Sequence, residues 1–217
     1  MGAYWKARGM SESSQVTAGG VGAVGGTGGG GEGVQAGARG GARRGLVIVY
    51  TGNGKGKTTA ALGMALRAVG HGMKVVMVQF IKGSWRYGEM EGVKRLMPEF
   101  ELVTAGRGFV GIIDDDLPRE AHVDAAREAL NLSRERLLSG IYDIVILDEV
   151  NYAVRLGLIG VDDVLELIRA KPYSTTLVLT GNYADERIID MADLVTEMRE
   201  VKHPFRKGMR ALKGVDF

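Results

Sequence analysis

The chain has 217 residues, a formal charge of +2 and no cysteine. The missing cysteines exclude disulfides and thiolate metal sites, and no apolar run approaches the roughly 20 residues that cross a bilayer. The charge is too small, and the basic residues are too scattered, to favour a nucleic-acid partner. We therefore expect a cytoplasmic protein that acts on a small molecule and contacts neither nucleic acid nor membrane.

The first 44 residues differ in composition from the rest of the chain. Glycine dominates the segment from Thr17 to Gly41, which has no hydrophobic periodicity. Such a segment buries too little apolar surface to offset the entropy lost on ordering. The composition predicts a disordered tail over residues 1–44 and one folded domain over residues 45–217.

Beyond Gly45, short β-branched runs alternate with helical periodicities. This alternation predicts an α/β fold with a mostly parallel sheet and helices on both faces. In chain order, the expected elements are strand 46–50, helix 59–69, strand 74–80, strand 100–104, helix 119–138, strand 142–147, helix 161–169, strand 175–180, helix 184–191 and strand 194–198. Loops are expected over 81–92 and 105–118. Both follow strands, and ligands bind at that edge of open α/β sheets.

The stretch TGNGKGKTT, Thr51–Thr59, joins the first expected strand to the first expected helix. Its Gly56-Lys57-Thr58 triplet matches the end of the P-loop pattern, in which a glycine stands five positions before the second glycine. Thr51 replaces that leading glycine here, while Gly52 and Gly54 supply the backbone freedom. The loop therefore predicts a nucleotide site.

Each residue type in the loop has a separate expected task. Backbone amides and the dipole of the following helix hold phosphates, Lys57 neutralises them, and the Thr58 hydroxyl reaches a Mg²⁺ ion. The expected ATP-binding residues are Gly52, Asn53, Gly54, Lys55, Gly56, Lys57, Thr58 and Thr59.

Two carboxylates, Asp148 and Glu149, follow the apolar run Ile144–Leu147. A carboxylate at such a strand end holds the metal of P-loop proteins directly or through water, whereas the simpler interpretation is a helix-capping Asp148. Together with the loop, the pair predicts a metal site made of Thr58, Asp148 and Glu149. Apart from Glu149, no residue stands out as a base for an attacking oxygen.

These motifs together resemble the P-loop ATP:corrinoid adenosyltransferases. The resemblance covers residues 45–217 and rests on TGNGKGKTTAA, on AVGHGMKVVMVQFIKGSW with the following Gly-Glu pair, on VILDE, on Thr180-Gly181 and on the final GVDF. Any P-loop protein supplies the first motif. The combination with QFIKG is much more specific.

The resemblance implies a RecA-like P-loop fold, a homodimer, Mg²⁺, and a transient flavoprotein reductant. It also implies transfer of the 5′-deoxyadenosyl group of ATP to the Co(I) of a reduced corrinoid, with release of triphosphate, in adenosylcobalamin synthesis or salvage. Because Co(I) carries no proton, the enzyme needs no base to activate it. The catalytic residues expected from this match are Lys57, Thr58 and Glu149.

The same resemblance assigns the corrinoid to Trp85, Phe109 and Gly111. Family members commonly carry two aromatics in the loop after the third strand, and here Gly111 replaces the second. They also commonly carry an arginine after the Thr-Gly pair, where this chain has Asn182.

Two other functions fit the residues. One is a P-loop ATPase or phosphotransferase in which Glu149 orients the attacking nucleophile, so that ADP and phosphate are the products. The other is an ATP-dependent corrinoid-binding module without turnover.

Overall fold

The computed structural model describes residues 43–82, 87–108 and 117–216. Six parallel strands form one sheet in the order β3-β2-β4-β5-β1-β6. The strands are β1 (Val47–Thr51), β2 (Val75–Gln79), β3 (Phe100–Thr104), β4 (Ile144–Asp148), β5 (Thr176–Thr180) and β6 (Leu194–Glu197). Strand β5 lies between β1, which leads into the P-loop, and β4, which ends at Asp148.

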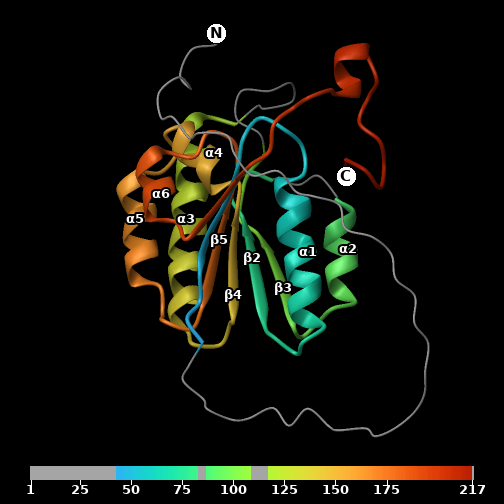
Figure 1. The fold of residues 1–217 in the computed structure, drawn as a ribbon. Helices are drawn as coiled ribbons and strands as arrows, with labels where there is room; N and C mark the ends of the chain where they lie inside the picture. Colours follow the sequence, from blue (N-terminus) through green and yellow to red (C-terminus); the bar gives the residue numbers. More distant parts are fainter. Residues whose placement is uncertain (1–42, 83–86, 109–116, 217) are drawn as a thin grey trace, which may run out of the picture. The chain divides into compact units, whose positions relative to one another are not determined.

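Helices cover both faces of this sheet (Figure 1). They are α1 (Lys57–Val69), α2 (Gly88–Lys94), α3 (Arg119–Leu138), α4 (Val150–Arg155), α5 (Val161–Ala170) and α6 (Glu186–Met191), followed by a 3₁₀ turn at Pro204–Lys207. The expected α/β class and the helices on both faces are confirmed. Among the described residues, no helix has the length and apolar character that a membrane span requires.

Two apolar cores flank the sheet because the inner strands β1, β2, β4 and β5 have helices on both sides and bury nearly all their side chains, whereas the edge strand β6 is exposed. One core joins alternate strand residues such as Ile48 and Met77 to the alanines of α1, Ala61, Ala65 and Ala68. The other joins the opposite strand residues to helices α3 to α6. The small alanine side chains let α1 lie close to the sheet, which fixes the start of that helix at the P-loop.

The sequence missed two helices. Residues 81–92 were expected to be a loop, but helix α2 begins at Gly88 within this range. Helix α4, which follows the carboxylate pair, was not expected at all. The two helices have seven and six residues, and hydrophobic periodicity needs a longer stretch to become recognisable.

Candidate active site

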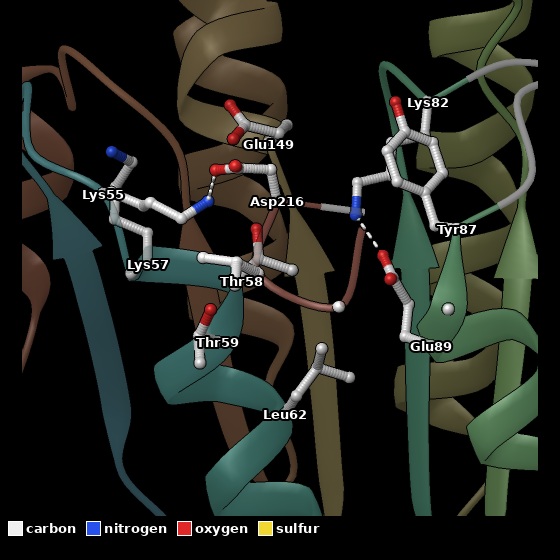
Figure 2. A pocket seen from close by; sticks show the side chains of 14 residues that line it. Lys55, Lys57, Thr58, Thr59, Leu62, Lys82, Tyr87, Glu89, Glu149 and Asp216 are labelled. Carbon is white, nitrogen blue, oxygen red and sulfur yellow. Dashed lines mark hydrogen bonds and ion pairs between the residues drawn. The ribbon is translucent and has the colours of Figure 1, made fainter. Parts of the chain in front are cut away.

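A cavity of about 540 Å³ lies at the carboxyl edge of the sheet. Four separate parts of the chain line it: the P-loop with the start of α1, Lys82 with residues 87–89, Glu149, and residues 214–216. Figure 2 shows the lysines of the P-loop on one side and Lys82, Tyr87 and Glu89 on the other.

The P-loop wall is built around Lys57, the first residue of α1. Gly56 before it has a φ of 115°, a conformation that favours glycine and that turns the loop into the helix. The Lys57 ammonium donates hydrogen bonds to Gly52 O at 2.8 Å and Gly54 O at 2.7 Å. Burial lowers the pKa of Lys57, while the nearby Glu149 and Asp148 raise it. The cation is therefore held inside the loop, where a phosphate oxygen can replace a carbonyl oxygen as its partner.

Gly52 and Gly54 are needed for a reason that the sequence did not reveal. The chain leaving β6 crosses the loop so closely that a Cβ on Gly54 would lie 2.7 Å from the Met198 oxygen and the Arg199 carbonyl carbon. Gly54 N donates to Met198 O at 2.6 Å, and Asn53 Oδ1 accepts from Glu200 N at 3.0 Å. Gly54 N and Asn53 Oδ1 therefore bind the chain after β6 and support the loop from outside. From the sequence, these residues were expected to bind phosphate.

Asp148, at the end of β4, is fully buried and accepts hydrogen bonds from three side chains. Thr58 Oγ1 and Thr180 Oγ1 donate to its Oδ1 at 2.8 and 2.7 Å, and Gln79 Nε2 donates to Oδ2 at 3.3 Å. The carboxylate does not line the cavity. It instead orients the Thr58 hydroxyl, which does.

Glu149 is the carboxylate that faces the cavity. Its φ of 63° is unusual for a residue other than glycine, and its N–H donates to Thr180 Oγ1 at 3.0 Å. Burial, with a smaller contribution from the neighbouring charge of Asp148, raises the pKa of Glu149 to about 7. Lys57 and Lys82 oppose this rise. A cation bound beside Glu149 would lower that raised pKa and favour the charged carboxylate.

The facing wall contains a cation that the sequence motifs did not single out. Lys82 Nζ forms an ion pair with Glu89, lies 4.4 Å from the centroid of the Tyr87 ring and lies 3.9 Å from Asp148 Oδ2. The side chains of Lys82 and Glu89 are only 12% and 15% exposed. Burial raises the pKa of the Tyr87 hydroxyl, although the Lys82 charge opposes that change.

The C-terminal turn closes a third side. Asp216 forms an ion pair of 2.6 Å with Lys55, and its other oxygen accepts from Leu212 N at 2.7 Å. These two interactions lower the pKa of Asp216, the backbone hydrogen bond contributing most. The final GVDF motif thus reaches the P-loop from about 160 residues away.

The structure brings together most of the residues that the sequence predicted for ATP and metal. Lys55, Gly56, Lys57, Thr58, Thr59 and Glu149 line the cavity, and Gly52, Asn53, Gly54 and Asp148 support them from behind. Trp85, Phe109 and Gly111, predicted for the corrinoid, lie outside the described residues. Sequence reasoning missed Lys82, Tyr87, Glu89 and Asp216, although all but Tyr87 belong to motifs that carried the family resemblance.

The Thr180-Gly181-Asn182 segment, in which Asn182 replaces the arginine common in the family, lies beside Glu149. A Cβ on Gly181, whose φ is +124°, would lie 2.8 Å from Tyr152 N and 3.2 Å from Glu149 Oε2, so only glycine fits there. Asn182 Oδ1 and both side-chain polar atoms of the fully buried Asn151 have no hydrogen-bond partner within the described part of the chain. Asn151, in helix α4, and Asn182, just after β5, thus place polar groups near Glu149.

A family model described as ATP:corrinoid adenosyltransferase BtuR/CobO/CobP matches residues 43–217. A corrinoid adenosyltransferase of Escherichia coli K12 is 40% identical over 174 residues, covering 80% of this chain and 86% of that protein. A corrinoid adenosyltransferase of Pseudomonas aeruginosa is 41% identical, with coverage of 80% and 84%. The crystal structure of the flagellar accessory protein FlaH from Methanocaldococcus jannaschii matches 71% of each chain with a TM-score of 0.48 and 14% identity.

Proposed function

The chain belongs to the ATP:corrinoid adenosyltransferase family, an assignment that makes it an enzyme transferring the adenosyl group of ATP to a corrinoid, and we propose that its P-loop cavity performs this transfer. The observation that carries the proposal is the convergence of Lys57, Thr58 and Glu149 on one cavity at the carboxyl edge of the sheet. Lys57 and Thr58 come from the P-loop helix, and Glu149 follows β4.

The proposed reaction is one displacement at carbon. The electron pair of Co(I) forms the cobalt–C5′ bond, the C5′–O5′ bond breaks, and its electron pair stays on the departing triphosphate. No proton is abstracted, so the site must position C5′ and stabilise negative charge on the leaving group. Lys57 suits this task because its ammonium is held inside the loop by two carbonyl oxygens that a phosphate oxygen can replace.

The oxygen groups near Thr58 fit a bound Mg²⁺. This ion prefers hard oxygen ligands and usually takes one or two carboxylates together with substrate phosphates. We assign the Thr58 hydroxyl and the Glu149 carboxylate to the metal, and Asp148 to the orientation of Thr58. When bound, Mg²⁺ would supply positive charge to the triphosphate.

Several further assignments follow from the same proposal. Trp85, Phe109 and Gly111 would contact the corrinoid, two chains would form a homodimer, and a flavoprotein would reduce the cobalt. The enzyme would act in the cytoplasm, and residues 1–44 would form a tail that is separate from the domain of residues 45–217.

An anaerobic assay tests the reaction directly. Chemically prepared cob(I)alamin, ATP and Mg²⁺ are mixed with the protein, and the alkyl-cobalt chromophore and inorganic triphosphate are measured together. We expect both products in equal amounts. ADP and phosphate without the chromophore would support the ATPase alternative, and tight ATP binding without any product would support the binding module. Either outcome would overturn the proposal.

A further inference from the structure

The backbone that carries Lys82 is held rigidly against the sheet. Lys82 follows Phe80 and Ile81, which are 2% and 1% exposed. Phe80 N donates to Asp148 O at 3.0 Å, and Gly108 N donates to Ile81 O at 3.0 Å. Neighbouring segments therefore hold this backbone on two sides, and Lys82 enters the cavity from a fixed position.

The Lys82 ammonium lies close to the residues assigned to the triphosphate. It is 3.9 Å from Asp148 Oδ2, while Thr58 Oγ1 donates to Oδ1 of the same carboxylate. Lys82 and Thr58 both line the cavity. Figure 2 shows Lys82 on the side opposite the P-loop, with its ammonium directed toward Glu89. A phosphate chain lying against Thr58 would thus have a lysine on each side.

Stability alone does not explain the pair of Lys82 and Glu89. Removing two charges from water costs several kcal/mol per ion, and apolar side chains of similar size are often at least as stabilising. This pair nevertheless lies at a cavity wall, with both side chains more than four-fifths buried. A cation kept desolvated and ready is what a site for a highly charged leaving group requires.

We propose that Lys82 is a second catalytic cation, which binds the triphosphate of ATP from the wall facing the P-loop and neutralises its growing charge as the C5′–O5′ bond breaks. Glu89 and Tyr87 are positioning residues that hold the ammonium before ATP enters. A phosphate oxygen then replaces the Glu89 carboxylate as the partner of Lys82. This inference rests on the proposed function and adds no reactant to the displacement described above.

Binding of inorganic triphosphate tests this role without any turnover. The full-length protein and its variants are titrated calorimetrically with magnesium triphosphate and, separately, with adenosine. We expect Lys82→Met to weaken triphosphate binding at least about tenfold, the value of one charge-assisted hydrogen bond, and to leave adenosine binding unchanged. Lys82→Arg should restore part of the affinity because it keeps the charge.

Two other variants separate the positioning role from general damage. Glu89→Gln removes the anion that competes for Lys82, so triphosphate should bind as tightly as to the wild type or more tightly. Lys94→Met is the matched control, because Lys94 forms an exposed ion pair of 2.7 Å with Glu91 on α2 and does not line the cavity. It should leave triphosphate binding unchanged. Lys82→Gln replaces Lys82→Met if the melting temperature shows that the latter does not fold.

The outcomes distinguish this inference from the proposed function. If a folded Lys82 variant binds triphosphate within about twofold of the wild type while Lys57→Ala loses binding, the role of Lys82 is wrong and the P-loop assignment stands. If Lys57→Ala also retains binding, the phosphate site itself has been misplaced. Loss of adenosine binding in Lys82→Met would show that the residue only maintains the shape of the cavity, which also overturns the inference.

Discussion

The two walls of the cavity are built differently. The P-loop wall is one continuous stretch whose backbone does much of the work, with the Lys57 ammonium held by carbonyls three and five residues away. The facing wall depends on side chains, and its ion pair of Lys82 and Glu89 spans the end of β2 and the start of α2. Both walls are thus built from residues close in the chain, but the second faces the P-loop only because β4 and β5 lie between β2 and β1 in the sheet.

This difference has a chemical consequence. A backbone cradle binds a phosphate whatever its side chains are, so the P-loop alone does not select a reaction. The facing wall carries a second cation, Lys82, and its position determines which part of the nucleotide lies beside that charge. We infer that the choice between attack at phosphorus and attack at C5′ depends on the residues facing the P-loop.

Lys57→Ala is expected to have the largest effect, because it removes the cation of the local wall. Adenosyl transfer from cob(I)alamin should fall by about 100-fold or more, as when one donor to a developing charge is lost. The rate of the alkyl-cobalt chromophore under anaerobic conditions is the measurement. A turnover within about twofold of the wild type would contradict the assigned role and would place catalysis on the facing wall.

Gly54→Ala should break the support of the P-loop by the chain after β6. Its new Cβ would lie 2.7 Å from backbone atoms of Met198 and Arg199, so we expect the free energy of unfolding to fall by about 1–3 kcal/mol. Denaturant unfolding measures this change. Gly63→Ala in α1 is the control: nothing lies within 4 Å of its Cβ, and the helix should gain about 0.5–1 kcal/mol. Equal effects of the two substitutions would show that the chain after β6 does not pack tightly against Gly54.

Strands and motifs were predicted well, and contacts between individual side chains were not, whether the partners are near in the chain, as Lys82 and Glu89 are, or far apart, as Lys55 and Asp216 are. The strands and the P-loop were identifiable because β-branched runs and the Gly-Lys-Thr pattern are local signals. Lys82 and Glu89 meet only because α2 begins where it does, and Asp216 reaches Lys55 only because β6 lies beside β1. No periodicity reports such contacts, so sequence reasoning left these side chains without a role.

The buried carboxyl of Glu149 should make stability depend on pH. Its pKa in the folded protein is about 7, above its ordinary value of 4.5. The folded state therefore binds more protons between these two values, and stability should fall as the pH rises through this window. Glu149→Gln should be more stable than the wild type above pH 7, by on the order of 2 kcal/mol, and equal to it near pH 4.

Denaturant unfolding across this pH range, without nucleotide and with a chelator, is the measurement for Glu149. The chelator matters because a bound cation would lower the pKa of the carboxyl and remove the effect. Glu166→Gln, which removes an exposed glutamate paired with Arg134, is the control for replacing a carboxylate away from the cavity. A wild-type stability that is flat from pH 5 to pH 7 would contradict the desolvated state of Glu149.

Asp216→Asn is expected to have the smallest effect, and it tests the third side of the cavity. Its ion pair with Lys55 is partly exposed, so the free energy of unfolding should change little. The substitution also removes a carboxylate from a cavity that must admit a triphosphate. The dissociation constant of ATP should therefore fall by about threefold at low salt, and the gain should shrink as salt screens the charges.

Glu91→Gln is the matched control for Asp216→Asn, because its ion pair with Lys94 has a similar length of 2.7 Å but lies outside the cavity. Calorimetric titration with ATP at two salt concentrations compares the variants. If Asp216→Asn binds ATP more weakly, the C-terminal turn contributes to the nucleotide site. If the affinity rises only at low salt, Asp216 acts as an anion that the triphosphate must displace from Lys55. The first result would make the C-terminal turn a binding element like the P-loop, and the second would make it a competitor for the same cation.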